Sequence, residues 1–322
     1  MIERQIMNYA KEKNTEKIIN LDENVMLALD FFTENKPPTF DANKYKLPFV
    51  VGSGNAYSTG LILFSENAAI FADESNFKKT IASFDEAIKK NLIKDAIIIS
   101  ASGEKDSVWE TELAKQHGLT TTLLTTKEQS EAAKIADEVK TYKSIAEPYT
   151  YNTVTYMGMI LSKTQENPSA IKEHIESLEF PNGFGEFNGY SFVVPDKFMN
   201  ICPMLDIKKS ELFGSKLSVR AFPQGHARHA KFVIRSNDEL VISLGQKNEN
   251  YGNPENRWDI ELSENADYAE VMALTYYIVG KIQGAKYPYF KENIENYTSD
   301  YGPKAYGSTT KHFETIVPGT EA

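Results

Sequence analysis

The sequence predicts an α/β protein with two doubly wound parallel-sheet domains in tandem, preceded by a helical N-terminal segment. Its 322 residues exceed what one hydrophobic core usually supports, and a hydrophobic fraction of 41% is enough to fill two cores. Strand and helix patterns alternate along the chain, as in a parallel sheet with helices on both faces. The same order of elements recurs after residue 165 with little residue identity, which indicates two copies of one unit.

Residues 1–40 precede the first domain and carry apolar residues at helical spacing, up to the helix-breaking pair Pro37-Pro38. The run Phe49-Val50-Val51 predicts a short buried strand. The expected elements after it are a helix at 57–64, a strand at 69–71, a helix at 76–90, a strand at 96–100, a helix at 107–117, a strand at 120–124 and a helix at 149–162. The first domain is therefore placed at residues 41–165.

A polar stretch that ends at Pro168 predicts the linker to a second domain, placed at residues 166–284. Its expected elements are a helix at 169–178, a strand at 190–194, a helix at 200–213, a strand at 217–221, a loop with two histidines, a strand at 239–244 and a helix at 268–283. The tail, residues 285–322, is rich in tyrosine among polar residues. It is expected to pack over the surface or on a partner chain, or to be partly disordered.

Composition limits the partners of the chain. The formal net charge of −10 disfavours binding to nucleic acid or to an anionic membrane surface. The single cysteine, Cys202, can form no intrachain disulfide and supplies no metal-ligand set, which is typical of a reducing compartment. The N-terminal residues lack the pattern of a signal peptide, and no apolar run approaches the length of a membrane span. We therefore expect a soluble cytoplasmic protein.

The strongest local signal is Ser100-Ala101-Ser102-Gly103, a hydroxyl-rich turn between a buried strand and a helix that begins near Ser107. The backbone N–H groups and the dipole of a helix N-terminus, together with hydroxyl groups, can bind a phosphate without much positive charge. This suits an acidic protein with a phosphorylated ligand. The alternative, a plain turn with a capped helix, has equal weight on this motif alone.

A second glycine-rich turn, Gly52-Ser53-Gly54-Asn55, follows the first predicted strand. Such a turn serves dinucleotide sites as well as ordinary tight turns. The third glycine of the dinucleotide fingerprint is missing, because Gly60 comes six residues after Gly54. We therefore expect no nucleotide cofactor, and no metal site.

The first domain resembles the sugar isomerase (SIS) domain family. That family has a glycine-rich turn after its first strand and then Ser-x-Ser-Gly-Glu/Asn-Thr leading into a helix that ends Ala-Lys-x-x-Gly. Here the corresponding residues are Ser100 to Glu104 and Ala114-Lys-Gln-His-Gly118, with Lys105 in place of the threonine. A further family pattern, Glu-x-x-x-x-Ser/Asn-Thr, is matched by Glu147 through Asn152-Thr153.

The second domain resembles the isomerase half of glucosamine-6-phosphate synthase and related phosphosugar isomerases and deglycases. The Lys-x-x-Glu helix of that enzyme is matched by Lys208-Lys-Ser-Glu211, and its Ala-Tyr-Pro-x-Gly-Glu-x-x-His segment by Ala221-Phe-Pro-Gln-Gly-His226-Ala-Arg-His229. The resemblance implies two SIS-type domains in tandem and a homodimer. It covers most of residues 45–283.

The resemblance also implies roles for individual residues. Aldose–ketose isomerisation moves a proton between C1 and C2 and needs a carboxylate base of raised pKa, for which Glu211 is the first candidate and Glu147 the next. His229 would open the sugar ring, and Lys208 would steady Glu211 or contact the substrate. The residues expected to bind the phosphosugar are Gly54, Asn55, Ser100, Ala101, Ser102, Gly103, Lys105, Ser107, Asn152 and His226.

Without the resemblance, Lys208 and Glu211 would form an ordinary surface ion pair, and His226 and His229 a solvent-exposed basic loop. The family match favours an isomerase, deaminating isomerase or deglycase that acts on a phosphorylated sugar or amino sugar. The main alternative is a non-catalytic SIS protein that senses a phosphosugar and regulates a partner. A periplasmic-type sugar-binding protein has the same two-domain outline, and the lack of a signal peptide disfavours it.

Overall fold

The computed structural model describes residues 18–230, 232, 234–299 and 314–320. The chain divides into two compact units, each with its own parallel sheet. The first unit contains Asn35–Gln165 together with the described residues 295–299 and 314–320. The second contains Glu166–Ile294 together with the described residues 18–34. The predicted α/β class with parallel sheets is therefore confirmed.

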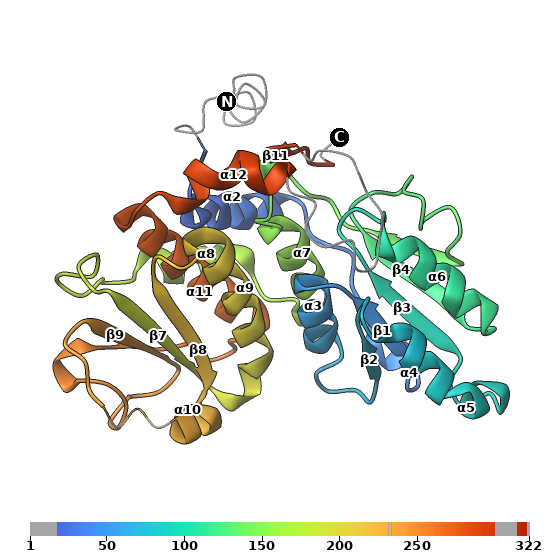
Figure 1. The fold of residues 1–322 in the computed structure, drawn as a ribbon, viewed down its shortest axis with the longest axis horizontal. Helices are drawn as coiled ribbons and strands as arrows, with labels where there is room; N and C mark the ends of the chain where they lie inside the picture. Colours follow the sequence, from blue (N-terminus) through green and yellow to red (C-terminus); the bar gives the residue numbers. More distant parts are fainter. Residues whose placement is uncertain (1–17, 231, 233, 300–313, 321–322) are drawn as a thin grey trace. The chain divides into compact units, whose positions relative to one another are not determined.

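The sheet of the first unit is fully parallel and has the strand order β2-β1-β3-β4-β5. Its strands are β1 (Phe49–Gly52), β2 (Ile70–Ala72), β3 (Asp95–Ile99), β4 (Thr120–Thr125) and β5 (Glu138–Thr141). Its helices are α3 (Asn55–Leu63), α4 (Phe77–Ser83), α5 (Asp85–Lys89), α6 (Asp106–Gln116) and α7 (Thr153–Thr164). Within this unit, α3 and α7 cover one face of the sheet and α4 and α6 the other (Figure 1).

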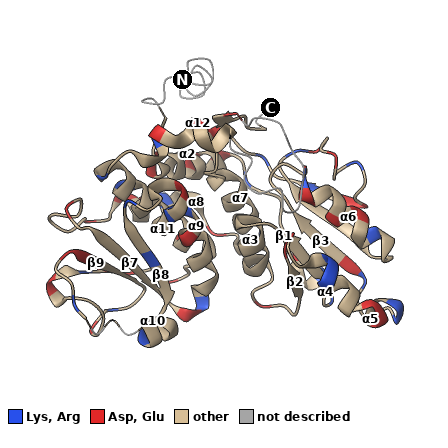
Figure 2. Ribbon diagram, viewed as in Figure 1, with Lys and Arg blue, Asp and Glu red and all other residues tan. Residues whose placement is uncertain are grey.

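Successive side chains of a strand point to opposite faces of the sheet, which explains why helices cover both faces. Phe49, Val51 and Ile98 are buried in the core on the side of α4 and α6. Val50 and Ile99 point to the opposite face, where they approach Gly60 of α3. Because both faces bury apolar side chains, the strands read as continuous hydrophobic runs in the sequence. Charged residues lie on helices such as α5 and α6, and β1 carries none (Figure 2).

The first unit differs from the sequence expectation in three places. The helix expected at 76–90 is divided into α4 and α5 at Phe84, whose backbone leaves the helical region (φ −107°) while its ring packs on Phe49. Strand β5 was not expected. The helix expected from residue 149 begins only at Thr153, because the backbones of Thr150 (φ 72°) and Asn152 (φ 47°) lie outside the right-handed helical region. Before them, Glu147–Pro148 form a short strand, β6, that pairs with β11 (Ile316–Val317).

The second unit has a parallel sheet in the order β10-β9-β7-β8. Its strands are β7 (Gly189–Val194), β8 (Ser218–Pro223), β9 (Glu239–Leu244) and β10 (Arg257–Ile260). Its helices include α2 (Leu21–Glu34), α8 (Pro168–Glu176), α9 (Cys202–Phe213), α10 (Gln224–Ala230) and α11 (Tyr268–Ala285), and α12 (Tyr289–Ser299) follows them. In both sheets the first strand is central, the second lies on one side of it, and the third and fourth lie on the other.

Two elements of the second unit contradict the sequence expectation. The histidine-containing segment is not a loop: it forms helix α10, directly after Pro223, and the carboxylate of Asp196 accepts a hydrogen bond from the N–H of Gly225 in its first turn (2.8 Å). Strand β10 extends the sheet where no element was expected. In the tail, residues 289–299 form a helix, whereas Tyr301 and Tyr306 lie outside the described residues. Across the described residues, no helix is long and apolar enough to cross a membrane.

Candidate functional site

The first unit has an open cavity of about 470 Å³ at the carboxyl ends of its strands. The strand order reverses between β1 and β3, because the chain goes from β1 to β2 on one side and returns to β3 on the other. In open α/β sheets, ligands bind in the crevice at such a reversal. Ser53, after β1, and the turn Ser100–Ser107, after β3, both line the cavity.

The turn after β3 supplies several polar residues of the wall. Its backbone is fixed from within, since Ser100 Oγ accepts a hydrogen bond from the N–H of Gly103 (3.1 Å) and Ser102 Oγ accepts one from the N–H of Glu104 (3.3 Å). Each hydroxyl acts as an acceptor here and keeps its proton for another partner. The N–H groups of Asp106 and Ser107 belong to the first turn of α6, where no intrahelical acceptor exists.

Two features of this turn explain its residue types. Gly103 has φ +63°, and a Cβ atom there would come within 2.0 Å of the hydroxyl of Ser130. The carbonyl of Ala101 accepts hydrogen bonds from Thr125 Oγ1 (3.1 Å) and Thr126 Oγ1 (2.8 Å), which tie the turn to the end of β4. The turn is therefore held rigidly before any ligand enters.

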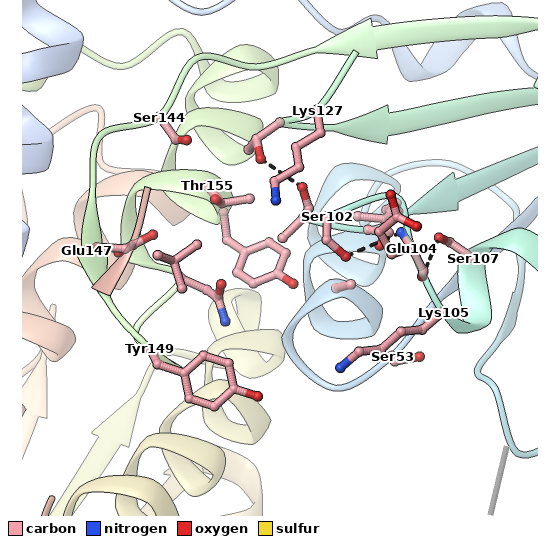
Figure 3. Close-up of a pocket in the computed structure, with 18 of the residues that line it drawn as sticks. Ser53, Ser102, Glu104, Lys105, Ser107, Lys127, Ser144, Glu147, Tyr149 and Thr155 are labelled. Atoms are coloured by element: carbon pink, nitrogen blue, oxygen red, sulfur yellow. Dashed lines mark hydrogen bonds between the residues drawn. The ribbon is translucent and has the colours of Figure 1, made fainter. Parts of the chain in front are cut away.

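The cavity wall combines two lysines with several carboxyl groups. Lys105 and Lys127 supply positive charge, and the acidic residues on the wall are Glu104, Asp106, Glu110, Glu147 and Glu314. Desolvation of the ammonium group lowers the pKa of Lys105. Figure 3 shows Ser102, Glu104, Lys105 and Ser107 gathered on one side of the cavity, with Glu147 and Tyr149 on the other.

Two of the acidic residues on the wall accept hydrogen bonds from other parts of the first unit. Glu147 is buried, and its Oε2 accepts hydrogen bonds from the N–H groups of Thr153 (2.8 Å) and Val154 (3.3 Å), so it caps α7. Asp106 accepts a hydrogen bond from the indole N–H of Trp109 (2.8 Å). Glu110 is different: it is 1% exposed, and no described residue offers a hydrogen-bond partner to its buried Oε1 atom. Burial raises the pKa of Glu110 to about 8, with Asp106, Glu74 and Asp73 adding to the effect.

The structure brings many of the sequence-predicted residues to this cavity. Those that line it are Ser100, Ala101, Ser102, Lys105, Ser107, Glu147 and Asn152. Gly54, Asn55 and Gly103 belong to the same turns but are not part of the wall. Asn55 is buried at the start of α3.

The remaining predicted residues belong to the second unit. Lys208 is fully buried, and its ammonium group contacts the carboxylate of Glu211 at 2.6 Å. The pair is therefore not an ordinary surface ion pair. Burial raises the pKa of Glu211, and Lys208 opposes this shift. His226 and His229 lie one helical turn apart on α10, and both are exposed.

Part of the cavity wall is not marked by any motif in the sequence. Among the wall residues that were not predicted are Ser53, Glu110, Thr126, Lys127, Ser144, Tyr149 and Thr155. Thr126 and Lys127 were accessible to the same logic as the Ser100 turn, because they directly follow the next parallel strand and parallel strands end at one edge of the sheet. Among the described residues, no group of histidine, cysteine and acidic side chains forms a metal site.

Comparison with known proteins agrees with this architecture. The sequence matches no protein-family model, and it matches no curated protein. The structure is similar to tagatose-6-phosphate ketose/aldose isomerase from Escherichia coli, with a TM-score of 0.53 and 12% identity over 82% of this chain and 87% of that one. It is also similar to glucosamine-6-phosphate deaminase from Thermotoga maritima, with a TM-score of 0.50 and 14% identity over 82% and 91% of the two chains.

A third similar structure is the C-terminal domain of glucosamine-fructose-6-phosphate aminotransferase from Francisella tularensis. Its TM-score is 0.50 and its identity 12%, over 89% of this chain and 96% of that one. At sequence identities this low, the similarity shows a shared fold and does not show a shared reaction. The resemblance to the sugar isomerase family that the motifs indicated is confirmed at the level of the fold.

Proposed function

We propose that this chain is a tandem SIS-type protein that binds a phosphorylated sugar or amino sugar and isomerises or deglycates it. The observation that carries the proposal is the cavity at the strand-order reversal, where the hydroxyls of Ser100 and Ser102 meet the N-terminus of α6. In this proposal the phosphate accepts hydrogen bonds from these hydroxyls and from the first N–H groups of α6. Lys105 and Lys127 balance its charge.

The proposed chemistry keeps the roles that the family resemblance implies. Glu211 takes a proton from one of the carbons C1 and C2 and returns it to the other, by way of an enediol or enamine. Its burial supports this role, because a raised pKa brings a carboxylate closer to the range where it can act as base and then acid. His229 exchanges the proton of the ring oxygen, Lys208 holds the carboxylate of Glu211, and the active form is a cytoplasmic homodimer.

The alternative is a non-catalytic phosphosugar sensor. The acid-rich cavity wall and the helix-capping role of Glu147 are compatible with a binding protein as well as with an enzyme. The two functions differ in what they require of Glu211. An isomerase needs its carboxylate, whereas a sensor needs only the cavity.

Proton exchange distinguishes the two. The protein is incubated in D₂O with fructose 6-phosphate, glucosamine 6-phosphate or a fructosamine 6-phosphate, and the C1 and C2 proton signals are followed by NMR. We expect exchange with at least one of these compounds, and its loss in Glu211→Gln with binding retained. Binding without proton exchange would contradict the isomerase and support the phosphosugar sensor. If none of the three compounds binds, both proposed functions are wrong.

A further inference from the structure

The cavity of the first unit contains an acidic residue that the family resemblance does not use. Glu110 lies on α6, three residues after Ser107 and four after Asp106, and so on the same helix face as both. Side chains on a helix point toward its N-terminus, so the carboxyl group of Glu110 is directed back to the first turn of α6. That turn is where the proposed phosphate would bind.

Among the described residues, no positively charged group acts on the carboxyl group of Glu110. Its Oε1 atom is buried without a hydrogen-bond partner there, and the side chain lines the cavity. The charged groups that act on it are Asp106 on its own helix and Asp73 and Glu74 in the segment before α4. All of them are acidic. On the cavity side, the positively charged residue closest to Glu110 in sequence is Lys105, the residue before the first turn of α6.

An ionised carboxylate at this position would repel a phosphate, whereas a carboxylic acid carries a proton to donate. A buried polar group that stays unpaired costs stability, so the unpaired Oε1 atom of Glu110, whose side chain lines the cavity, calls for a partner that a bound ligand can supply. The raised pKa of Glu110, about 8, agrees with the protonated form at neutral pH.

We propose that Glu110 is a ligand-recognition residue of this cavity, whose carboxylic acid group donates a hydrogen bond to a phosphate oxygen of the bound ligand. This inference rests on the proposed function, because it requires that the cavity take a phosphate. It adds a residue that the motifs did not indicate. It also predicts that phosphate binding and the protonation of Glu110 are linked.

Calorimetry tests the proposal with fructose 6-phosphate and inorganic phosphate, neither of which carries an amine that would titrate. From about pH 7 to about pH 9.5 we expect the wild-type affinity to fall at least about tenfold, because ionisation of Glu110 removes the donor. In buffers of different ionisation enthalpy, binding near pH 8.5 is expected to take up a large fraction of a proton.

Two variants distinguish a role of Glu110 in phosphate binding from a purely structural role. Glu110→Gln keeps a donor and cannot ionise, so it should bind both probes at neutral pH and lose the proton uptake. Glu112→Gln, an exposed change on the same helix, is the matched control and should behave as the wild type. Lys105 remains in both variants, so its own titration cancels in the comparison.

The outcomes are distinct. Binding with the same proton uptake in Glu110→Gln as in the wild type would overturn the role of Glu110 and leave the proposed function standing. An affinity that rises with pH in the wild type and not in Glu110→Gln would also overturn it, because ionisation of Glu110 would then strengthen binding. If neither probe binds the wild type, both the phosphate site and the role of Glu110 are wrong.

Discussion

Lys105 and Gly54 adopt the same backbone conformation, each at the residue before a helix of the first unit. Lys105 has φ 57° and ψ −119° before α6, and Gly54 has φ 56° and ψ −119° before α3. Glycine reaches this region without strain, whereas a residue with a Cβ atom is held there at a cost of about 1–3 kcal/mol. Lysine therefore stands at position 105 against the backbone preference, on the wall of the candidate cavity.

Lys105→Gly is expected to stabilise the protein and weaken phosphate binding. Relief of strain should raise the free energy of unfolding by about 1 kcal/mol, and loss of the ammonium group should lower phosphosugar affinity about tenfold. Urea unfolding and calorimetry measure the two effects. Lys105→Ala is the control, because it removes the charge and keeps the Cβ atom. A glycine variant that binds as tightly as the wild type would show that the lysine has no part in binding.

The stability of the protein should depend on pH through Glu110. Its pKa in the folded state, about 8, lies above its ordinary value of 4.5, so the folded state holds the proton more strongly than the unfolded state. This contribution is complete below about pH 4.5 and is lost as pH rises toward about 8, by about 1.4 kcal/mol for each pH unit and about 5 kcal/mol in total.

Urea unfolding of the wild type and of Glu110→Gln between about pH 5 and about pH 9 isolates this effect, because the other titrating groups are common to both proteins. The wild type should lose stability relative to the variant up to about pH 8, and the difference should then level off. A constant difference over the whole range would show that Glu110 is ionised in the folded protein at neutral pH.

Glu147 is expected to act as a helix cap and not as the catalytic base. Glu147→Ala leaves the N–H groups of Thr153 and Val154 without their acceptor and should lower the free energy of unfolding by about 1–2 kcal/mol. Glu147→Gln keeps an acceptor oxygen and should retain most of that stability. It should also retain proton exchange with the sugar phosphate. Exchange that disappears in Glu147→Gln and persists in Glu211→Gln would assign the base to Glu147.

The sequence allowed the Ser100 turn and the alternating strands and helices to be predicted because each of these depends on residues that are close together in the chain. A buried strand, a glycine that needs a positive φ and a helix start all fall between residues 96 and 107. Helix α10 stands where a loop was expected, and its first turn is supported by a hydrogen bond from Gly225 to Asp196, a contact that no local pattern shows. Glu110 was missed because nothing adjacent in sequence shows that it is buried beside Glu74 and Asp73.

The part of the cavity wall formed by Glu314, Val317 and Pro318 could not be predicted from the sequence either, because it depends on contacts between distant segments. Thr320 accepts a hydrogen bond from the N–H of Ser144 (2.8 Å) and its own N–H donates to the carbonyl of Ser144 (2.7 Å). Strand β11 pairs with β6, and Val317 and Pro318 line the cavity. The contacts join residues that are 168 to 176 positions apart in the sequence, and no local pattern marks them.

Deletion of residues 314–322 should therefore weaken ligand binding more than it weakens the fold. It removes Glu314, Val317 and Pro318 from the wall and the pairing partner of β6, while the sheet and core of the first unit keep their contacts. We expect phosphosugar affinity to fall about tenfold or more, with a loss of unfolding free energy of about 1–3 kcal/mol. Thr320→Val is the milder test: it removes the hydroxyl that anchors the segment to Ser144 and should produce a smaller change in the same direction. Unaltered affinity in the deletion variant, measured by calorimetry, would show that the ligand does not reach this wall.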